Sequence, residues 1–188
     1  MKVYYTVEVR DKEGKLLKRL RRRSRSYVRQ WNDIICVQMC PSTNRTIKDT
    51  GGVNRTTINS DNLGAEPGAG ALTRGIIVGI GSTAVSISDY ALGTECVEGT
   101  GADQLNYLAQ TYTAPAVSGS ECSFTTTRVA NNNSGNTVTV TEIGIYVLAV
   151  DSGSTSRIFL GIRDVLASSQ AVPDGGAITV VYTLKVTV

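Results

Sequence analysis

The chain begins with a strict alternation of apolar and polar positions. In "KVYYTVEVR", one side of the alternation carries Val3, Tyr5, Val7 and Val9. A period of two predicts a half-buried β-strand. The glycine in "DKEGK" suits a hairpin turn, and "LLKRLRRR" then follows as a partner strand whose outward side is almost wholly cationic. The start of the chain therefore predicts a β-hairpin with one basic side.

The spacing of apolar residues changes after Ser24 and Ser26, either of which is suited to cap a helix. The next apolar residues recur along one helical face, at Tyr27, Trp31, Ile34, Ile35 and Met39. Pro41 is expected to end this helix. We expect its apolar stripe, and in particular Tyr27, Trp31 and Ile35, to pack against a sheet, the hairpin or a neighbouring subunit.

Residues 41–74 are rich in Ser, Thr, Asn and Gly and predict a short polar hairpin or an extended arm. From residue 75 onward the pattern is that of β-strands separated by Gly, Asn, Ser and Asp turns, in "GIIVGIG", "TAVSIS", "ECSFTTTRVANN", "TVTVTEIGIYVLAV", "RIFLGI" and "AITVVYTLKVTV". The sequence thus predicts a mainly β protein with an antiparallel β-sandwich body at 75–188. An anchor of hairpin plus helix at 1–40 and a polar arm at 41–74 precede it.

The sequences of two strands of this body allow more specific predictions. In "TVTVTEIGIYVLAV" the inward positions change parity between Val140 and Ile143, which predicts a β-bulge near Thr141 and Glu142. The last segment is the cleanest amphipathic strand in the chain, with its apolar side at Ile178, Val180, Tyr182, Leu184, Val186 and Val188.

Charge is divided unequally along the chain. Residues 1–29 hold 11 Lys and Arg against 3 Asp and Glu, whereas residues 30–188 hold 8 against 13. The excess is concentrated in one basic stretch, at Arg19, Arg21, Arg22, Arg23, Arg25 and Arg29. Three interpretations are open: an electrostatic assembly contact with another subunit or a negatively charged partner surface, a face that binds nucleic acid, or a solvated strand surface.

Little in the composition points to catalysis. The chain has no histidine, which excludes serine and cysteine triads that need one as well as histidine metal ligands. Its acidic residues are spread over turns and strand ends at no spacing typical of an acid–base pair. The four cysteines, Cys36, Cys40, Cys96 and Cys122, lack the CxxC pairing of zinc sites, so free thiols are the preferred interpretation. We expect no catalytic residue, no metal and no cofactor.

No apolar run approaches the length of about 20 residues that a membrane-spanning helix needs, and the N-terminus does not resemble a signal peptide. We therefore expect a protein made in the cytoplasm that has no membrane partner.

The C-terminal half resembles structural proteins of tailed bacteriophages and related prokaryotic viruses. The likeness is carried by four segments in the same order: "GIIVGIGSTAVSISDYAL", "FTTTRVANNNSGNTVTVTEIGIYV", "RDVL" and "VPDGGAITVVYTLKV". It covers about residues 75–188. The resemblance implies a jelly-roll-like β-sandwich that assembles in many copies in a capsid, on its surface as a decorating subunit, or in a tail appendage, and it implies no catalytic residue.

The expected function is therefore that of a non-enzymatic virion structural protein whose partners are copies of itself and other virion proteins. One alternative is a tail or fibre module that binds a receptor or glycan, which predicts a cluster of exposed aromatics among Tyr90, Tyr107, Tyr112 and Tyr146. The other is a capsid protein whose arginines at residues 19–29 face the genome.

Overall fold

The computed structural model describes residues 2–24, 28, 34, 45–57, 64–113 and 116–187. Within these residues the chain is mainly β, all strand pairs between its elements are antiparallel, and no helix is among the elements. The strands are β1 (Lys2–Arg10), β2 (Leu16–Arg23), β3 (Arg45–Lys48), β4 (Asn54–Thr57), β5 (Gly75–Gly79), β6 (Asn106–Tyr107), β7 (Thr111–Tyr112), β8 (Ala116–Ser118), β9 (Glu121–Asn131), β10 (Val138–Val150), β11 (Ser156–Val172) and β12 (Ala177–Thr187).

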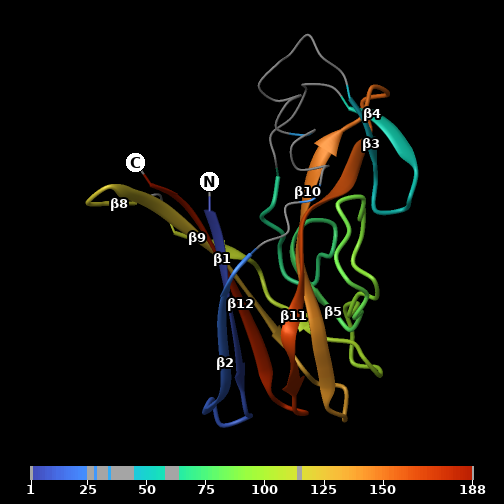
Figure 1. Ribbon diagram of the computed structural model, residues 1–188. Coiled ribbons are helices and arrows are strands. Elements are labelled where there is room, and N and C mark those ends of the chain that lie inside the picture. The colour runs from blue at the N-terminus through green and yellow to red at the C-terminus, as the bar shows by residue number, and fades with distance from the viewer. Residues whose placement is uncertain are drawn as a thin grey trace.

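The strands form two facing sheets and a small hairpin (Figure 1). The large sheet has the order β2-β1-β12-β9-β6, and the short strands β7 and β8 also pair with β9. The second sheet has the order β11-β10-β5, and β3 and β4 pair only with each other. This arrangement agrees with the predicted antiparallel β-sandwich, while the jelly-roll detail stays a prediction.

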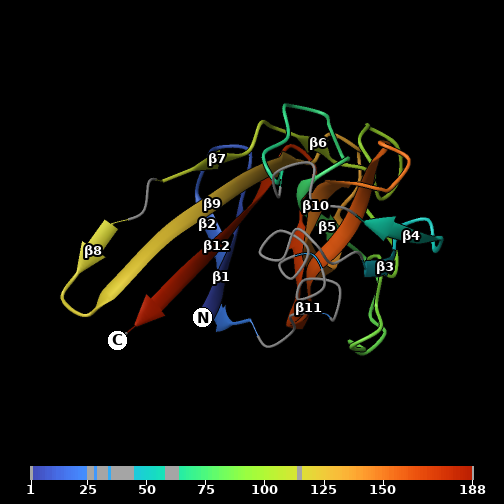
Figure 2. The same ribbon diagram turned by 90° about the horizontal axis from the view of Figure 1, so that it is seen from above.

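The apolar positions of both sheets meet in one core. From the large sheet it takes residues such as Val7, Val180 and Tyr182, and from the second sheet residues such as Ile143 and Phe159, each no more than 1% exposed. Seen from above, the sheets lie opposite each other at one end and diverge toward β8 and the C-terminus (Figure 2). The core is therefore closed at one end, and the far ends of β8, β9 and β12 project beyond it.

The local predictions for the first and last strands are confirmed. All four apolar positions of β1 are buried, and Gly14 has the positive φ of 81° that the β1–β2 turn requires. In β12, Ile178, Val180 and Tyr182 are buried at alternate positions and Leu184 is half-buried, so the pattern is confirmed for the described part of the strand. The side chains of Val186 and Val188 lie outside the described residues.

The predicted bulge is confirmed as well, because the pairing of β10 with β11 shifts register between Val140 and Glu142.

The hairpin β1–β2 is a part of the sandwich, since β1 pairs with β12 along its whole length, from Lys2–Lys185 to Arg10–Ala177. The helix predicted after it falls outside the described residues, apart from Ser24, Val28 and Ile34, all three of which are buried. Within the polar stretch at 41–74, residues 45–57 form the hairpin β3–β4. This hairpin is tied to the second sheet, because the Thr50 amide donates to the Ile158 carbonyl at 3.0 Å.

Candidate functional site

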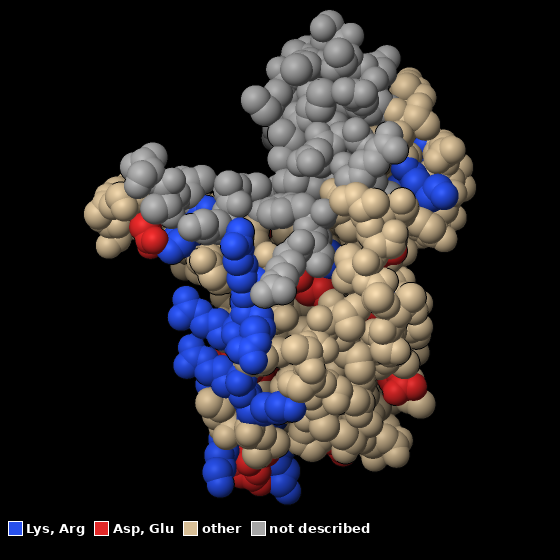
Figure 3. All heavy atoms as spheres, viewed as in Figure 1, with Lys and Arg blue, Asp and Glu red and all other residues tan. Residues whose placement is uncertain are grey.

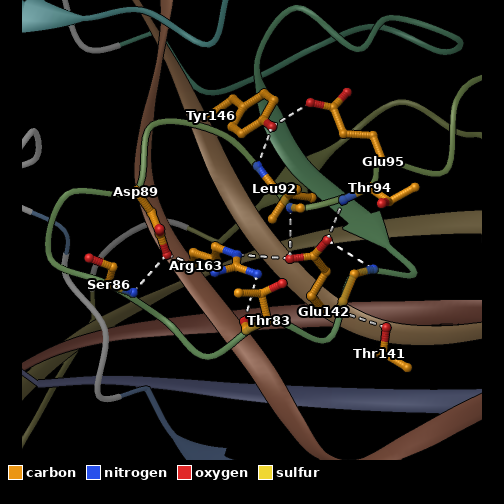
Figure 4. Close-up of polar contacts among 12 residues, drawn as sticks. Thr83, Ser86, Asp89, Leu92, Thr94, Glu95, Thr141, Glu142, Tyr146 and Arg163 are labelled. Atoms are coloured by element: carbon orange, nitrogen blue, oxygen red, sulfur yellow. Dashed lines mark hydrogen bonds and ion pairs between the residues drawn. The ribbon is translucent and has the colours of Figure 1, made fainter. Parts of the chain in front are cut away.

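Three of the four segments that carry the resemblance meet around one buried ion pair, Glu142 and Arg163 (Figure 4). Glu142 lies on β10 at the register shift, and its side chain is fully buried. Its carboxylate accepts hydrogen bonds from the amides of Gly81 at 3.1 Å, Gly93 at 3.1 Å and Thr94 at 2.9 Å, and from Arg163 Nε at 2.8 Å. Every direction around this carboxylate is therefore occupied by a donor of the protein itself.

Arg163, on β11, extends the network to the covering loop at 80–95. Its Nη1 donates to Asp89 at 2.7 Å and its Nη2 donates to the Thr83 carbonyl at 3.0 Å. Burial by itself lowers the pKa of this guanidinium, but the hydrogen bonds and charges of Asp89 and Glu142 outweigh burial and raise the pKa. Arg163 is thus a permanent cation that holds the loop against the outer side of the second sheet.

Tyr146 adds a second attachment of the same loop, four residues after Glu142. Its hydroxyl donates to Glu95 and accepts from the Leu92 amide at 2.9 Å. Burial, followed by the charge of Glu95, raises the pKa of this tyrosine, so its hydroxyl stays protonated as the donor.

Glycines let the loop approach this closely. A Cβ on Gly81 would lie 2.3 Å from Glu142 Oε1, and one on Gly79 would lie 2.4 Å from the Thr94 carbonyl oxygen. These contacts give a physical reason for the glycines in "GIIVGIG".

The "RDVL" segment connects two sides of the molecule, because neighbouring residues of a strand point to opposite faces. Arg163 reaches the covering loop, while Asp164 accepts from the Tyr182 hydroxyl of β12 at 3.2 Å and from Ser24 Oγ at 2.9 Å. One dipeptide therefore connects the loop, the second sheet and the large sheet.

A second buried cation, Arg128, was not singled out from the sequence. It lies on β9 with 2% exposure and donates to the carbonyls of Ile76 at 3.0 Å and Ala71 at 2.6 Å. Its guanidinium also stacks 4.7 Å from the ring centre of Tyr107. The alternation of residues along β9 could have identified it, because Arg128 lies on the same inward face of the strand as Thr126 and Ala130.

We call the network of Asp89, Glu142, Tyr146, Arg163, Asp164 and Tyr182 the lock. Within it the Arg163 guanidinium is paired with both Asp89 and Glu142, and the network joins the covering loop to both sheets. No group of three or more residues that could hold a metal ion occurs in the parts of the chain that the structure describes. Burial raises the pKa of the free Cys96 thiol to about 12, so this thiol stays protonated. Cys36, Cys40 and the side chain of Cys122 lie outside the described residues.

Among the predicted contact residues, the structure describes Arg19, Arg21, Arg22 and Arg23. All four lie on β2, the edge strand of the large sheet, and all are exposed. They belong to a continuous column of basic side chains on this side of the molecule (Figure 3). Arg25, Tyr27, Arg29, Trp31 and Ile35 lie outside the described residues, so their predicted contacts stay predictions.

The aromatic cluster that a receptor-binding module requires is not formed by the four candidate tyrosines. Tyr107 and Tyr146 are buried, whereas Tyr90 and Tyr112 are 38% and 63% exposed and line different cavities. Tyr90 is also engaged within the chain, since Lys48 Nζ lies 5.1 Å from its ring centre.

No helix of the described residues is long and apolar enough to cross a membrane. Comparison of the chain with protein-family models, with curated proteins and with solved structures found no match in any of the three.

Proposed function

We propose that this chain is a non-enzymatic structural subunit of a virus particle, which assembles with copies of itself or on a capsid shell. The observation that carries the proposal is the buried lock. The segments that resemble virion structural proteins are far apart in the sequence, yet Glu142, Arg163, Asp164 and Tyr182 join them through side-chain contacts. Residues that stabilise a sandwich in this way support a scaffold role for the shared segments.

A surface suited to contacts between subunits lies where β8, β9 and β12 project from the body (Figures 1 and 2). We call this projection, residues 116–126 and 182–187, the wing. Val117 near its tip is 77% exposed, and Tyr112 on the adjoining β7 is 63% exposed. Tyr112 and Val117 pair with positions 126 and 122 of β9, which share one face of the sheet, and exposed apolar surface of this kind marks sites where proteins meet partners.

The wing continues into a cleft between the two sheets. The cleft measures about 620 Å³ and its wall is mostly apolar, with Tyr112, Phe124 and Leu184 on the large sheet and Ile145 and Val147 on the second sheet. Val117 is paired with position 122, which shares its strand face with Phe124, so the exposed valine and the cleft lie on the same side of the large sheet. We propose that a second copy packs against this side.

The test is the mass of the full chain measured by light scattering over a range of concentrations, at low and at high salt. We expect multiples of the 20.0 kDa chain mass that persist at high salt, because an apolar contact is not screened by ions. Val117→Asp should lower the mass, since it places a charge in the contact. Ile87→Asp is the matched control, because Ile87 is 64% exposed and lies on the covering loop, away from the wing.

Two results would contradict this proposal. A wild-type chain that stays monomeric at all concentrations would remove the basis for self-assembly. An assembly that dissociates at high salt, and whose mass Val117→Asp does not change, would instead assign the contact between subunits to the arginines of β2.

A further inference from the structure

The β1–β2 hairpin carries more positive charge than its own carboxylates can neutralise. Residues 2–24 contain nine Lys and Arg residues and only Glu8, Asp11 and Glu13 as acidic residues. Glu8 pairs with both Arg10 at 3.1 Å and Arg19 at 3.2 Å, and Glu13 pairs with Lys12 at 3.6 Å. The Asp11 carboxylate accepts from the Lys15 amide within the turn. Within the described parts of the chain, the side chains of Lys15, Lys18, Arg21 and Arg23 have no carboxylate partner.

Beyond residue 30, the described part of the chain offers few carboxylates without an internal partner that could serve this surface in a second copy. Nine of the eleven acidic residues that the structure describes beyond residue 30 accept hydrogen bonds within their own chain: Asp49, Asp89, Glu95, Glu98, Glu121, Glu142, Asp151, Asp164 and Asp174. Five of these nine carboxylates are also paired with a cation of their own chain: Asp49, Asp89, Glu121, Glu142 and Asp151. Much of the negative charge of the described body is therefore neutralised inside the fold. The unneutralised cations of β2 suit an external polyanion better than the body of another copy.

The strand geometry orders these cations along one line. Arg19, Arg21 and Arg23 are opposite Glu8, Thr6 and Tyr4 of β1, so they share the outer face of the large sheet. Alternate residues of a strand are roughly 6.6–6.8 Å apart, and the edge strand keeps them at fixed spacing. Further across this face Thr6, Thr179 and Thr183 add hydroxyl donors, and Lys185 lies 5.6 Å from the ring centre of Tyr4.

We infer that the outer face of β1 and β2 binds nucleic acid through its phosphate backbone, without sequence preference. Arginine, lysine and threonine are among the side chains that contact the phosphate oxygens of nucleic acids. The face around Arg21 and Arg23 is polar, whereas the centre of a protein interface is typically apolar. The inference goes beyond the proposed structural role and stands whether or not the chain forms part of a particle.

The test measures binding of the full chain to labelled random-sequence oligonucleotides, single- and double-stranded, by fluorescence anisotropy between 50 and 200 mM salt. Over this range, a protein that makes about 6–10 phosphate contacts loses roughly 10³–10⁵-fold in affinity. We expect wild-type binding that weakens as salt rises. Arg21→Gln with Arg23→Gln should reduce the slope of log affinity against log salt by roughly 1.4–1.8, since each lost phosphate contact contributes about 0.7–0.9.

The matched control is Lys48→Gln with Arg74→Gln, which removes the same charge from elsewhere. Lys48 ends β3 and Arg74 directly precedes β5, on the opposite side of the molecule from β2 (Figure 1). We expect its salt slope to equal that of the wild type, and thermal unfolding of both double variants confirms that they are folded.

Three results would overturn the inference. These are the absence of oligonucleotide binding at the lowest salt concentration, a β2 double variant that binds as the wild type does, and a control that loses as much slope as the β2 variant. A wild-type chain that binds poly-glutamate but neither oligonucleotide would assign the face to an acidic protein partner.

Discussion

Individual side chains of this protein act over long sequence distances. Arg163 connects Asp89 to Glu142, and the next residue, Asp164, connects β11 to β12. The residue types were visible in the sequence, but their partners were not, because ion pairs between distant strands depend on how the sheets stack. The acidic residues looked like scattered turn residues for this reason. A charged residue at an inward strand position, such as Arg128, is the signal that single-sequence reasoning can use.

We predict that Arg163→Met destabilises the chain by about 3–5 kcal/mol, because it leaves Glu142 buried without its cation. The free energy of unfolding is measured by urea denaturation. Arg21→Met is the control, since Arg21 is exposed on β2, and it should change the free energy by no more than about 0.5 kcal/mol. A loss at Arg163 as small as that of the control would show that the lock is not structural.

At the scale of strands and turns, two hairpins share one turn design. "DTGGVNR" at 49–55 and "DSGSTSR" at 151–157 each begin with an aspartate and end with an arginine six residues later. Asp49 accepts from the Val53 amide and Arg55 Nε, and Asp151 accepts from the Thr155 amide and Arg157 Nε. The Ser152 amide then joins the two hairpins by donating to the Thr56 carbonyl.

Acid should weaken these two turns. At Asp49 burial opposes ionisation, but the hydrogen bonds from Arg55 and the backbone outweigh burial and lower the pKa. At Asp151 the hydrogen bond from Arg157 is the main cause that lowers the pKa. A carboxyl group whose pKa falls on folding contributes stability above its unfolded pKa of about 3.9, and this stability is lost as pH falls through the folded value. Asp49→Asn with Asp151→Asn should therefore be less stable than the wild type at pH 7.

Urea unfolding at a series of pH values from 7 down to 3 measures this effect. The stability difference between wild type and double variant should shrink toward the acid end, because the carboxyls of the unfolded chain bind protons there before those of the folded chain do. A difference that does not change with pH would mean that hydrogen bonding to a neutral side chain, and not charge, supports the turns.

Two strands with strong period-two patterns, β1 and β12, were predictable from the sequence, and so was the bulge near Glu142, where the inward parity changes. The strand predicted for "TAVSIS" was wrong, because residues 83–88 belong to the covering loop and pair with no strand. Which strands are neighbours in the sheet was not predictable in this way, since β1 pairs with β12, which is almost the whole chain away in sequence. The basic strand β2 was likewise predicted, as the hairpin partner of β1, and its position at the edge of the large sheet shows why its charge is tolerated. Like charges along an exposed edge discourage pairing with other edges.

For the whole molecule, the two proposed contact surfaces lie on opposite faces of the large sheet. Arg21 and Arg23 are on the outer face, and Val117 and Phe124 are on the side of the cleft. This separation predicts that assembly and nucleic-acid binding can be lost independently. Arg21→Gln with Arg23→Gln should keep the assembled mass in light scattering, while Val117→Asp should keep wild-type affinity for an oligonucleotide short enough to engage one copy.

Long nucleic acid should respond differently, because an assembly presents many basic faces to one strand. Linked sites can raise the overall affinity by about 10²–10⁴-fold without any new contact. Val117→Asp should therefore weaken binding to a long strand while binding to a short one is unchanged, which anisotropy on the two lengths measures. If the β2 arginine variant also loses assembled mass, the same arginines join subunits together, and the two surfaces are not independent.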